Sequence, residues 1–150
     1  QLQQRGYTPN SRWLRRELVA ADADEQLALG LSPGARVARL ERLRLADEVV
    51  MAYETSVIPA SVLPHPEQVD HSLYAYLERG GHMPVRALQH IRAMNASTQL
   101  ANQLGVPEGQ AVLFITRVGY LESGVAVELT HSYCRSDYYD FVAELRRAPA

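Results

Sequence analysis

The sequence predicts an α+β domain in which helices pack on one antiparallel sheet. Two observations lead to this prediction. Residues 25–56 resemble residues 98–132, and each segment contains a short Leu/Ala-rich helix, a Pro-Gly turn, a β-rich strand, a tight turn and a second strand. Strands joined by tight turns pair antiparallel, whereas parallel pairing requires a crossover at every step. We therefore expect one helix-plus-hairpin unit that is used twice in a single sheet.

The helices are predicted from capping signals. Asp22 followed by Glu25 is a capping-box pattern that opens the first helix. Gly30 and Gly105 lie where the first helices of the two units are expected to stop. Between the units, a proline-rich loop leads to a further helix predicted over 72–79.

The strands are predicted from runs of β-branched and aromatic residues. Besides the second strand of each hairpin, these runs cover 13–19, 37–45, 85–94 and 112–120, and a last strand is predicted at 139–145. The expected order is strand, helix, hairpin, helix, strand, helix, hairpin, strand.

Length and composition favour a single domain without an obvious route to catalysis. A chain of 150 residues that is 47% hydrophobic is long enough for one core. No run approaches the roughly 18 to 20 apolar residues of a membrane span, and the N-terminus lacks a signal-peptide profile, so we expect a cytoplasmic protein. All fifteen basic residues are arginine, which excludes Schiff-base lysine chemistry. The net charge of −2 disfavours DNA binding by this chain alone.

Two arginines on one predicted strand form a candidate anion site. Arg42 and Arg44 are two residues apart, so both side chains project from one face of the strand, about 7 Å apart. This spacing suits one phosphate or carboxylate group. Alternatively, both are ordinary solvent-facing residues. In the second unit Arg42 has a counterpart in Arg117, whereas Arg44 is replaced by Gly119.

Glu54 and Glu128 are predicted to occupy matching places in the second strands of the two hairpins. Two carboxylates from related hairpins can line one cavity and accept hydrogen bonds from hydroxyl groups or an amine. They can equally serve as ion-pair partners for the arginines. The sequence leaves both interpretations open.

No cofactor or metal site is expected. The five histidines show no zinc-ligand spacing. The single cysteine, Cys134, cannot form an internal disulfide, and His131 on the same strand is expected to face the other way, which argues against a catalytic pair. The chain also lacks a Gly-rich phosphate loop and a dinucleotide fingerprint.

Three sequence blocks carry a family resemblance over nearly the whole chain. The blocks RLERLRLADEVVMAYETSVIP, SLYAYLE and VPEGQAVLFITRVGYLESGVAVELTHSYCRSDYYDFVAEL resemble the UTRA domain of the HutC branch of GntR-type transcription regulators. The resemblance implies that residues 1–150 are a single ligand-sensing domain with a chorismate-lyase-like fold. It also implies a homodimer, and a linked N-terminal winged-helix DNA-binding domain that this chain does not contain.

The resemblance further implies roles for individual residues. In members that respond to amino sugars, arginines matching Arg42 and Arg44 hold a phosphate, and glutamates matching Glu54 and Glu128 contact the sugar. The start of the helix at 72–79 assists, since free backbone N–H groups favour anions.

The complete predicted ligand-binding set is Arg42, Arg44, Glu54, Ser72, Leu73, Tyr74, Glu128, Tyr133 and Arg135. The last two residues flank Cys134, which stands where the family often has a tyrosine near the ligand. The expected effector is a phosphorylated (amino) sugar or a similar small anion, and its binding is expected to modulate operator binding. An enzyme of the chorismate-lyase type on the same fold is the alternative, because a fold alone does not decide function.

Overall fold

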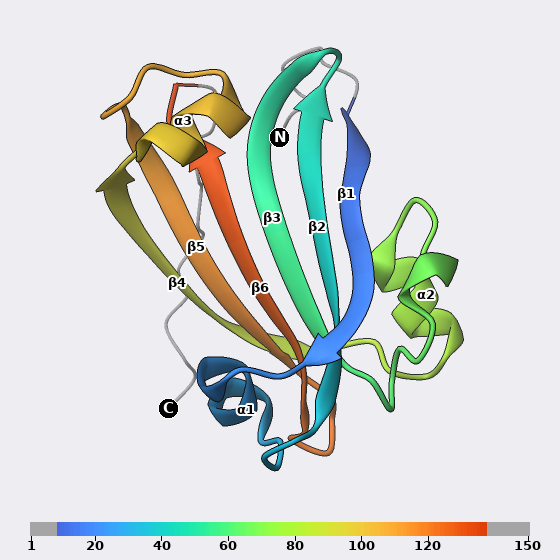
Figure 1. Ribbon diagram of the computed structural model, residues 1–150. Helices are drawn as coiled ribbons and strands as arrows, with labels where there is room; N and C mark the ends of the chain where they lie inside the picture. The colour runs from blue at the N-terminus through green and yellow to red at the C-terminus, as the bar shows by residue number, and fades with distance from the viewer. Residues whose placement is uncertain (1–8, 138–150) are drawn as a thin grey trace, which may run out of the picture.

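The computed structural model describes residues 9–137. Six strands form one fully antiparallel sheet in the order β1-β2-β3-β6-β5-β4 (Figure 1). The elements are β1 (Pro9–Ala20), α1 (Ala23–Leu29), β2 (Arg36–Ala46), β3 (Val49–Pro59), the 3-10 turn η2 (Pro66–Gln68), α2 (Leu73–Arg79), β4 (Arg86–Asn95), α3 (Thr98–Leu104), β5 (Ala111–Tyr120) and β6 (Ala126–Arg135). The predicted α+β class and the order of elements are confirmed through β6, and the strand predicted at 139–145 lies outside the described residues.

The predicted helix boundaries are confirmed by their caps. Asp22 accepts a hydrogen bond from the backbone N–H of Glu25, and the Glu25 side chain accepts one from Asp22 in return, which completes the capping box of α1. Gly30 and Gly105 end α1 and α3 in the left-handed conformation, with φ of 64° and 68°. Glycine adopts this conformation without the steric cost of a Cβ atom.

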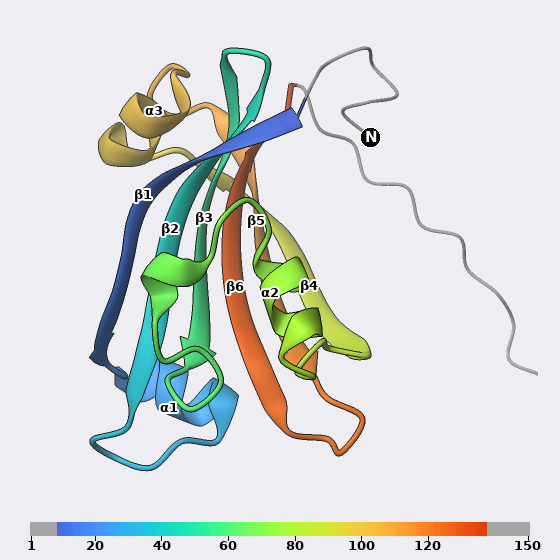
Figure 2. The same cartoon turned by 90° about the vertical axis from the view of Figure 1, so that its right-hand side faces the viewer.

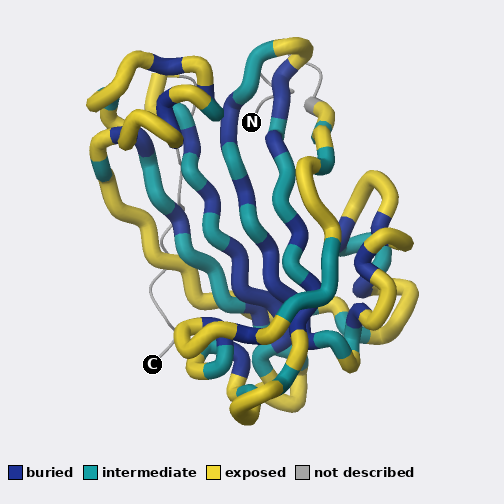
Figure 3. The backbone as a smooth tube through the Cα atoms, viewed as in Figure 1, coloured by how far each residue is buried: buried dark blue, intermediate teal, exposed yellow. Residues whose placement is uncertain are grey.

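The helices lie on both faces of the sheet (Figures 1 and 2). On one face, Leu29 of α1 packs with Val37 and Val57, and α3 packs on its own cluster around Val112. On the other face, α2 packs through Leu73 and Leu77 in a cluster that includes strand residues Ala38, Leu40 and Ile58. Most buried strand residues belong to the central strands, whereas β4 is exposed along nearly its whole length (Figure 3). No helix among residues 9–137 is long and apolar enough to cross a membrane.

The two related units meet where β3 pairs with β6. The hydroxyl oxygens of Ser56 and Thr130, which are cross-strand partners in this pairing, lie 2.8 Å apart. Helix α1 contacts β6 and helix α3 contacts β3, so each unit's helix lies over the other unit's last strand. The duplication in the sequence is therefore also a duplication in space.

The structure corrects one detail of this duplication. Arg42 pairs with Glu54 across the first hairpin, but its counterpart Arg117 pairs with Thr130 across the second. Glu128 pairs instead with Gly119, the counterpart of Arg44. The prediction that the two glutamates occupy matching places is wrong by two residues. The reason is that the second hairpin has the longer turn, and each hairpin has its own irregularity in register.

Candidate ligand-binding site

A polar cavity of about 410 Å³ lies on the face of the sheet that carries α2. We call it the anion cavity. It is lined by Ser11, Arg42, Arg44, Glu54, Ser56, His71, Ser72, Leu73, Tyr74, Arg117 and Glu128. The structure therefore brings together all of the predicted ligand-binding residues except Tyr133 and Arg135.

The strand geometry explains how Arg42 and Arg44 reach this cavity. They occupy alternate positions of β2, and alternate residues of a strand share a face. The guanidinium of Arg42 lies 5.3 Å from the ring centroid of Trp13, whose indole N–H donates to the Asp70 carbonyl at 2.6 Å. This hydrogen bond ties β1 to the loop before α2. Arg42 is thus packed into the wall of the cavity rather than projecting freely into solvent.

Burial gives Arg42 a strong preference for a negative partner. Its side chain is 12% exposed, against 36% for Arg44. Burial lowers the pKa of Arg42, and the positive charges of Arg44 and Arg117 lower it further, whereas Glu54 acts in the opposite direction. An anion in the cavity would relieve this repulsion.

Glu54 is the carboxylate that faces the arginine pair. It lies 3.2 Å from Nη1 of Arg44 and 3.5 Å from Nε of Arg42, and it accepts a hydrogen bond from the Ser132 hydroxyl at 2.7 Å. Glu54 therefore both lines the cavity and pairs with the arginines. The ion-pair interpretation is confirmed for this residue, and contact with a ligand stays a prediction.

Glu128 is more deeply buried than Glu54 and accepts more hydrogen bonds. Its side chain is 1% exposed and accepts hydrogen bonds from Tyr74 at 2.9 Å, Arg117 at 3.0 Å and Thr130 at 2.6 Å. Burial and the adjacent Glu128 carboxylate raise the pKa of Tyr74, so its hydroxyl stays protonated and keeps donating. Glu128 thereby connects α2 to the sheet beneath it.

Arg117 gives the cavity its excess of positive charge. With Arg42, Arg44 and Arg117 charged against Glu54 and Glu128, the ionic side chains sum to +1. Burial opposes the charge on Arg117, but Glu128, Tyr74 and Glu54 together outweigh burial, and the pKa of Arg117 is raised. Its buried Nε–H has no hydrogen-bond partner in the described part of the chain.

Four lining residues were absent from the predicted set. The duplication pointed to Arg117 as the counterpart of Arg42, and this signal was sufficient to include it. His71 directly precedes the predicted helix start at Ser72, so its position was also accessible from the sequence. Ser11 and Ser56 carried no comparable signal.

The Ser72 hydroxyl, which is in the predicted set, caps α2 by accepting a hydrogen bond from the backbone N–H of Ala75 at 3.1 Å.

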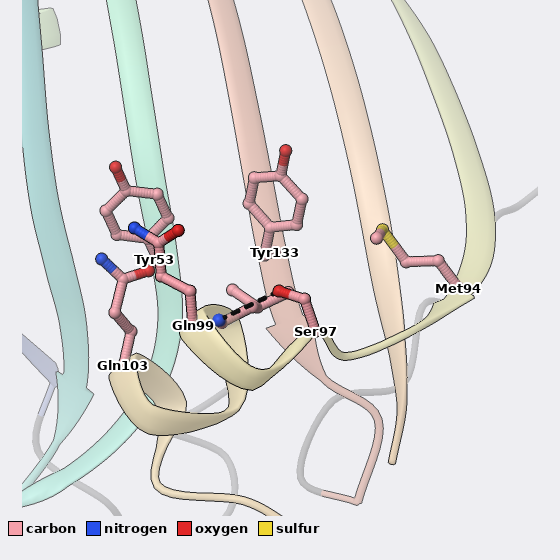
Figure 4. A pocket seen from close by; sticks show the side chains of 7 residues that line it. Tyr53, Met94, Ser97, Gln99, Gln103 and Tyr133 are labelled. Carbon is pink, nitrogen blue, oxygen red and sulfur yellow. Dashed lines mark hydrogen bonds between the residues drawn. The ribbon is translucent and has the colours of Figure 1, made fainter. Parts of the chain in front are cut away.

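Tyr133 and Arg135 lie away from the anion cavity, on the opposite face of the sheet. Tyr133 stacks on Phe114 at 4.7 Å between ring centroids and, with Tyr53, lines a separate cavity of about 250 Å³ beside α3 (Figure 4). Arg135 pairs with Asp137 at 3.0 Å. The reason is strand alternation, since odd-numbered residues in this part of β6 face α1 and α3.

The predicted separation of Cys134 and His131 is confirmed. Cys134 is buried on the α2 face, whereas the His131 ring stacks on Phe114 on the other face, 5.5 Å between centroids. Among residues 9–137, no group of three or more His, Cys, Asp or Glu side chains is arranged to hold a metal ion.

Comparison with known proteins assigns this fold to a family. The family model for the UTRA domain matches residues 4–140, and the chain belongs to the UTRA family. This is the class of effector-binding domain found in GntR-family transcription regulators.

Relatives and solved structures agree with this assignment. The chain is 36% identical to the transcriptional repressor NagR of Bacillus subtilis over 97% of its own length and 61% of NagR. It is 35% identical to the repressor PhnF of Mycolicibacterium smegmatis over 81% of its length and 52% of PhnF. The crystal structure of the effector domain of PhnF from Mycobacterium smegmatis superposes with a TM-score of 0.89 at 28% identity, covering 97% of this chain and 92% of that domain. The chain thus spans little more than half the length of these curated relatives.

Proposed function

We propose that this domain senses a small anionic metabolite, a phosphorylated amino sugar or a close analogue, and modulates operator binding by a linked winged-helix domain. The observation that carries the proposal is the anion cavity, in which three arginines face two glutamates. Two guanidinium groups on one strand offer charge-assisted contacts to a phosphate. The glutamates offer acceptors for hydroxyl or amino groups of a sugar. The proposed regulator works in the cytoplasm, where its operator lies.

The amino-sugar class is supported by the match of Arg42, Arg44, Glu54 and Glu128 to the residues that amino-sugar-responsive members of the family use, and by the charge of the cavity. In the ligand-free protein Arg42 and Arg44 are already paired with Glu54, so a ligand phosphate competes with this carboxylate for them. A phosphate that reaches Arg42 and Arg44 must share them with Glu54, because the hydrogen bond from Ser132 holds the Glu54 carboxylate in place. A ligand group that donates to Glu54 while its phosphate contacts the arginines satisfies all three side chains at once. A phosphate with a neighbouring hydroxyl or amine has this pattern.

The test is a thermal-shift titration with glucosamine 6-phosphate, its N-acetyl form and inorganic phosphate. A ligand that binds only the native state raises the melting temperature, by an amount that grows with the ligand concentration relative to Kd. Arg44→Ala is expected to abolish the shift, whereas Arg12→Ala, which removes the same charge from an exposed position on the opposite face, should leave it intact. An undiminished shift in Arg44→Ala would exclude the arginines as the anion site.

We also propose that the domain forms a homodimer, because regulators of this class must match palindromic operators with a two-fold axis. Strand β4 supports this proposal. Among residues 9–137 it is an edge strand that pairs only with β5, and its Leu88 and Ile91 are 54% and 46% exposed. Sedimentation at protein concentrations on the order of 100 µM is expected to show a dimer. A monomer alone at these concentrations would contradict the proposal for this domain.

A further inference from the structure

A second cavity of about 180 Å³ continues from the anion cavity toward β5. The two cavities share Arg44, Glu54 and Arg117, so these ionic side chains form a common boundary. We call the second cavity the apolar chamber. Its remaining lining residues are Ala52, Gln89, Ile115, Ser132 and Cys134. A ligand held at Arg44 is therefore adjacent to both spaces.

One side of the chamber is an apolar wall, opposite the Gln89 side chain and the ionic side chains that the chamber shares with the anion cavity. Ala52, Ile115 and Cys134 are 2%, 7% and 4% exposed and pack together as one cluster. The Ser132 hydroxyl is already donated to Glu54. Burial, together with the nearby Glu54 carboxylate, raises the pKa of Cys134 to about 12, so the thiol is uncharged at neutral pH. A wall of this kind favours an uncharged, apolar occupant.

The duplication shows why no helix of the described range covers this apolar surface. In the first unit, Ala38 and Ile58 are cross-strand partners, and α2 packs on them. The corresponding partners in the second unit are Leu113 and Cys134. The cluster around Cys134 contains only strand residues within the range 9–137. The chamber therefore stands where the first unit has a covering helix and the second, over this range, has none.

We propose that the effector carries a short, uncharged apolar branch beside its acid group, and that this branch occupies the apolar chamber. The inference rests on the proposed function, since the acid group must sit at the arginines. A volume of about 180 Å³ corresponds to about six water molecules of roughly 30 Å³ each. The part beside the shared ionic side chains is left to the acid group, and the remainder has room for a branch of about four carbon atoms. Ile115 and Cys134 then determine which branch length is accepted.

The probes are inorganic phosphate and the monoesters ethyl, butyl and hexyl phosphate, with affinity measured by calorimetric titration on the whole chain. These probes place an acid group at the arginines and vary only the apolar part. Each methylene that enters the chamber is expected to raise affinity about fourfold, as transfer of one CH₂ from water predicts. The gain should stop beyond butyl phosphate, when the chamber is full.

Two variants change the size of the chamber in opposite directions. Cys134→Leu narrows it, and the gain in affinity with chain length is expected to disappear. Because added volume in a packed site can impair folding, Ile115→Ala provides a second test that enlarges the chamber. This variant should extend the gain to hexyl phosphate. Thr116→Ala, at the next position of β5 and facing the other side of the sheet, is the matched control and should reproduce the wild-type series.

The possible outcomes separate this inference from the proposed function. If phosphate binds in an Arg44-dependent way but affinity does not rise with chain length, the chamber proposal is overturned and the anion site stands. A gain that is unchanged in both Cys134→Leu and Ile115→Ala would mean that the chain lies elsewhere, and this too overturns it. If none of the phosphates binds, the phosphate class proposed above is wrong and the inference fails with it.

Discussion

Glu128→Gln is expected to destabilise the ligand-free domain, because Glu128 accepts three hydrogen bonds while its side chain is 1% exposed. Hydrogen bonds to charged groups contribute about 1.5–3 kcal/mol each. The glutamine amide keeps one acceptor oxygen, but its NH₂ group must face a donor from Arg117, Tyr74 or Thr130. Arg117 is 29% exposed, so solvent offsets part of its lost charge partner. The net loss is expected to be about 2–3 kcal/mol of unfolding free energy.

Urea denaturation followed by tryptophan fluorescence measures this loss, since Trp13 is the single tryptophan and lies beside Arg42. Glu122→Gln is the control, because it neutralises an exposed carboxylate in the β5–β6 turn, away from the anion cavity. It should change the free energy of unfolding by less than about 0.5 kcal/mol. If Glu128→Gln is as stable as this control, then the carboxylate does not hold α2 on the sheet in the way described.

Two further predictions concern packing and pH. Gly119→Ala places a Cβ 2.9 Å from Oε1 of Glu128 and 3.1 Å from Pro84. This substitution is expected to lower the unfolding free energy by about 1–3 kcal/mol. An unchanged melting temperature would contradict the close packing around Gly119. Burial lowers the pKa of His131 below its usual 6.5, so the unfolded chain takes up a proton more readily than the native one. The unfolding free energy should therefore fall as the pH drops through 6.5 toward the lowered native pKa. This decrease should be smaller in His131→Gln, and equal slopes in the two proteins would rule out His131 as its source.

The parts of the site that follow from local rules were predictable from the sequence. Alternation along a strand placed Arg42 and Arg44 on one face and separated His131 from Cys134. The same rule, applied to Tyr133 and Arg135, would have removed them from the predicted set, because they flank a residue that faces the cavity. These two errors came from treating sequence neighbours as spatial neighbours.

Other features depend on tertiary structure and were not accessible. The offset between Glu54 and Glu128 arises from hairpin register, which is set by turn length and irregular pairing rather than by similarity of sequence. The apolar chamber depends on which strands α2 covers and which it leaves uncovered. Nothing in the local sequence around Ile115 distinguishes a covered strand surface from an open one.

The exchange of helices between the two units bears on how such a domain could arise. In a single helix-plus-hairpin unit, the part of the helix that contacts the other unit's last strand would have no partner. Such a unit would bury more apolar surface when two copies associate, in the manner of a domain-swapped pair. Fusion of the two copies into one chain would turn their shared interface into the interior of one protein. It would also free each copy to change independently, so that the first kept Arg44 while the second acquired Gly119. On this view the anion cavity, which draws residues from both copies, began as the meeting surface of two identical chains and became asymmetric only after they were joined.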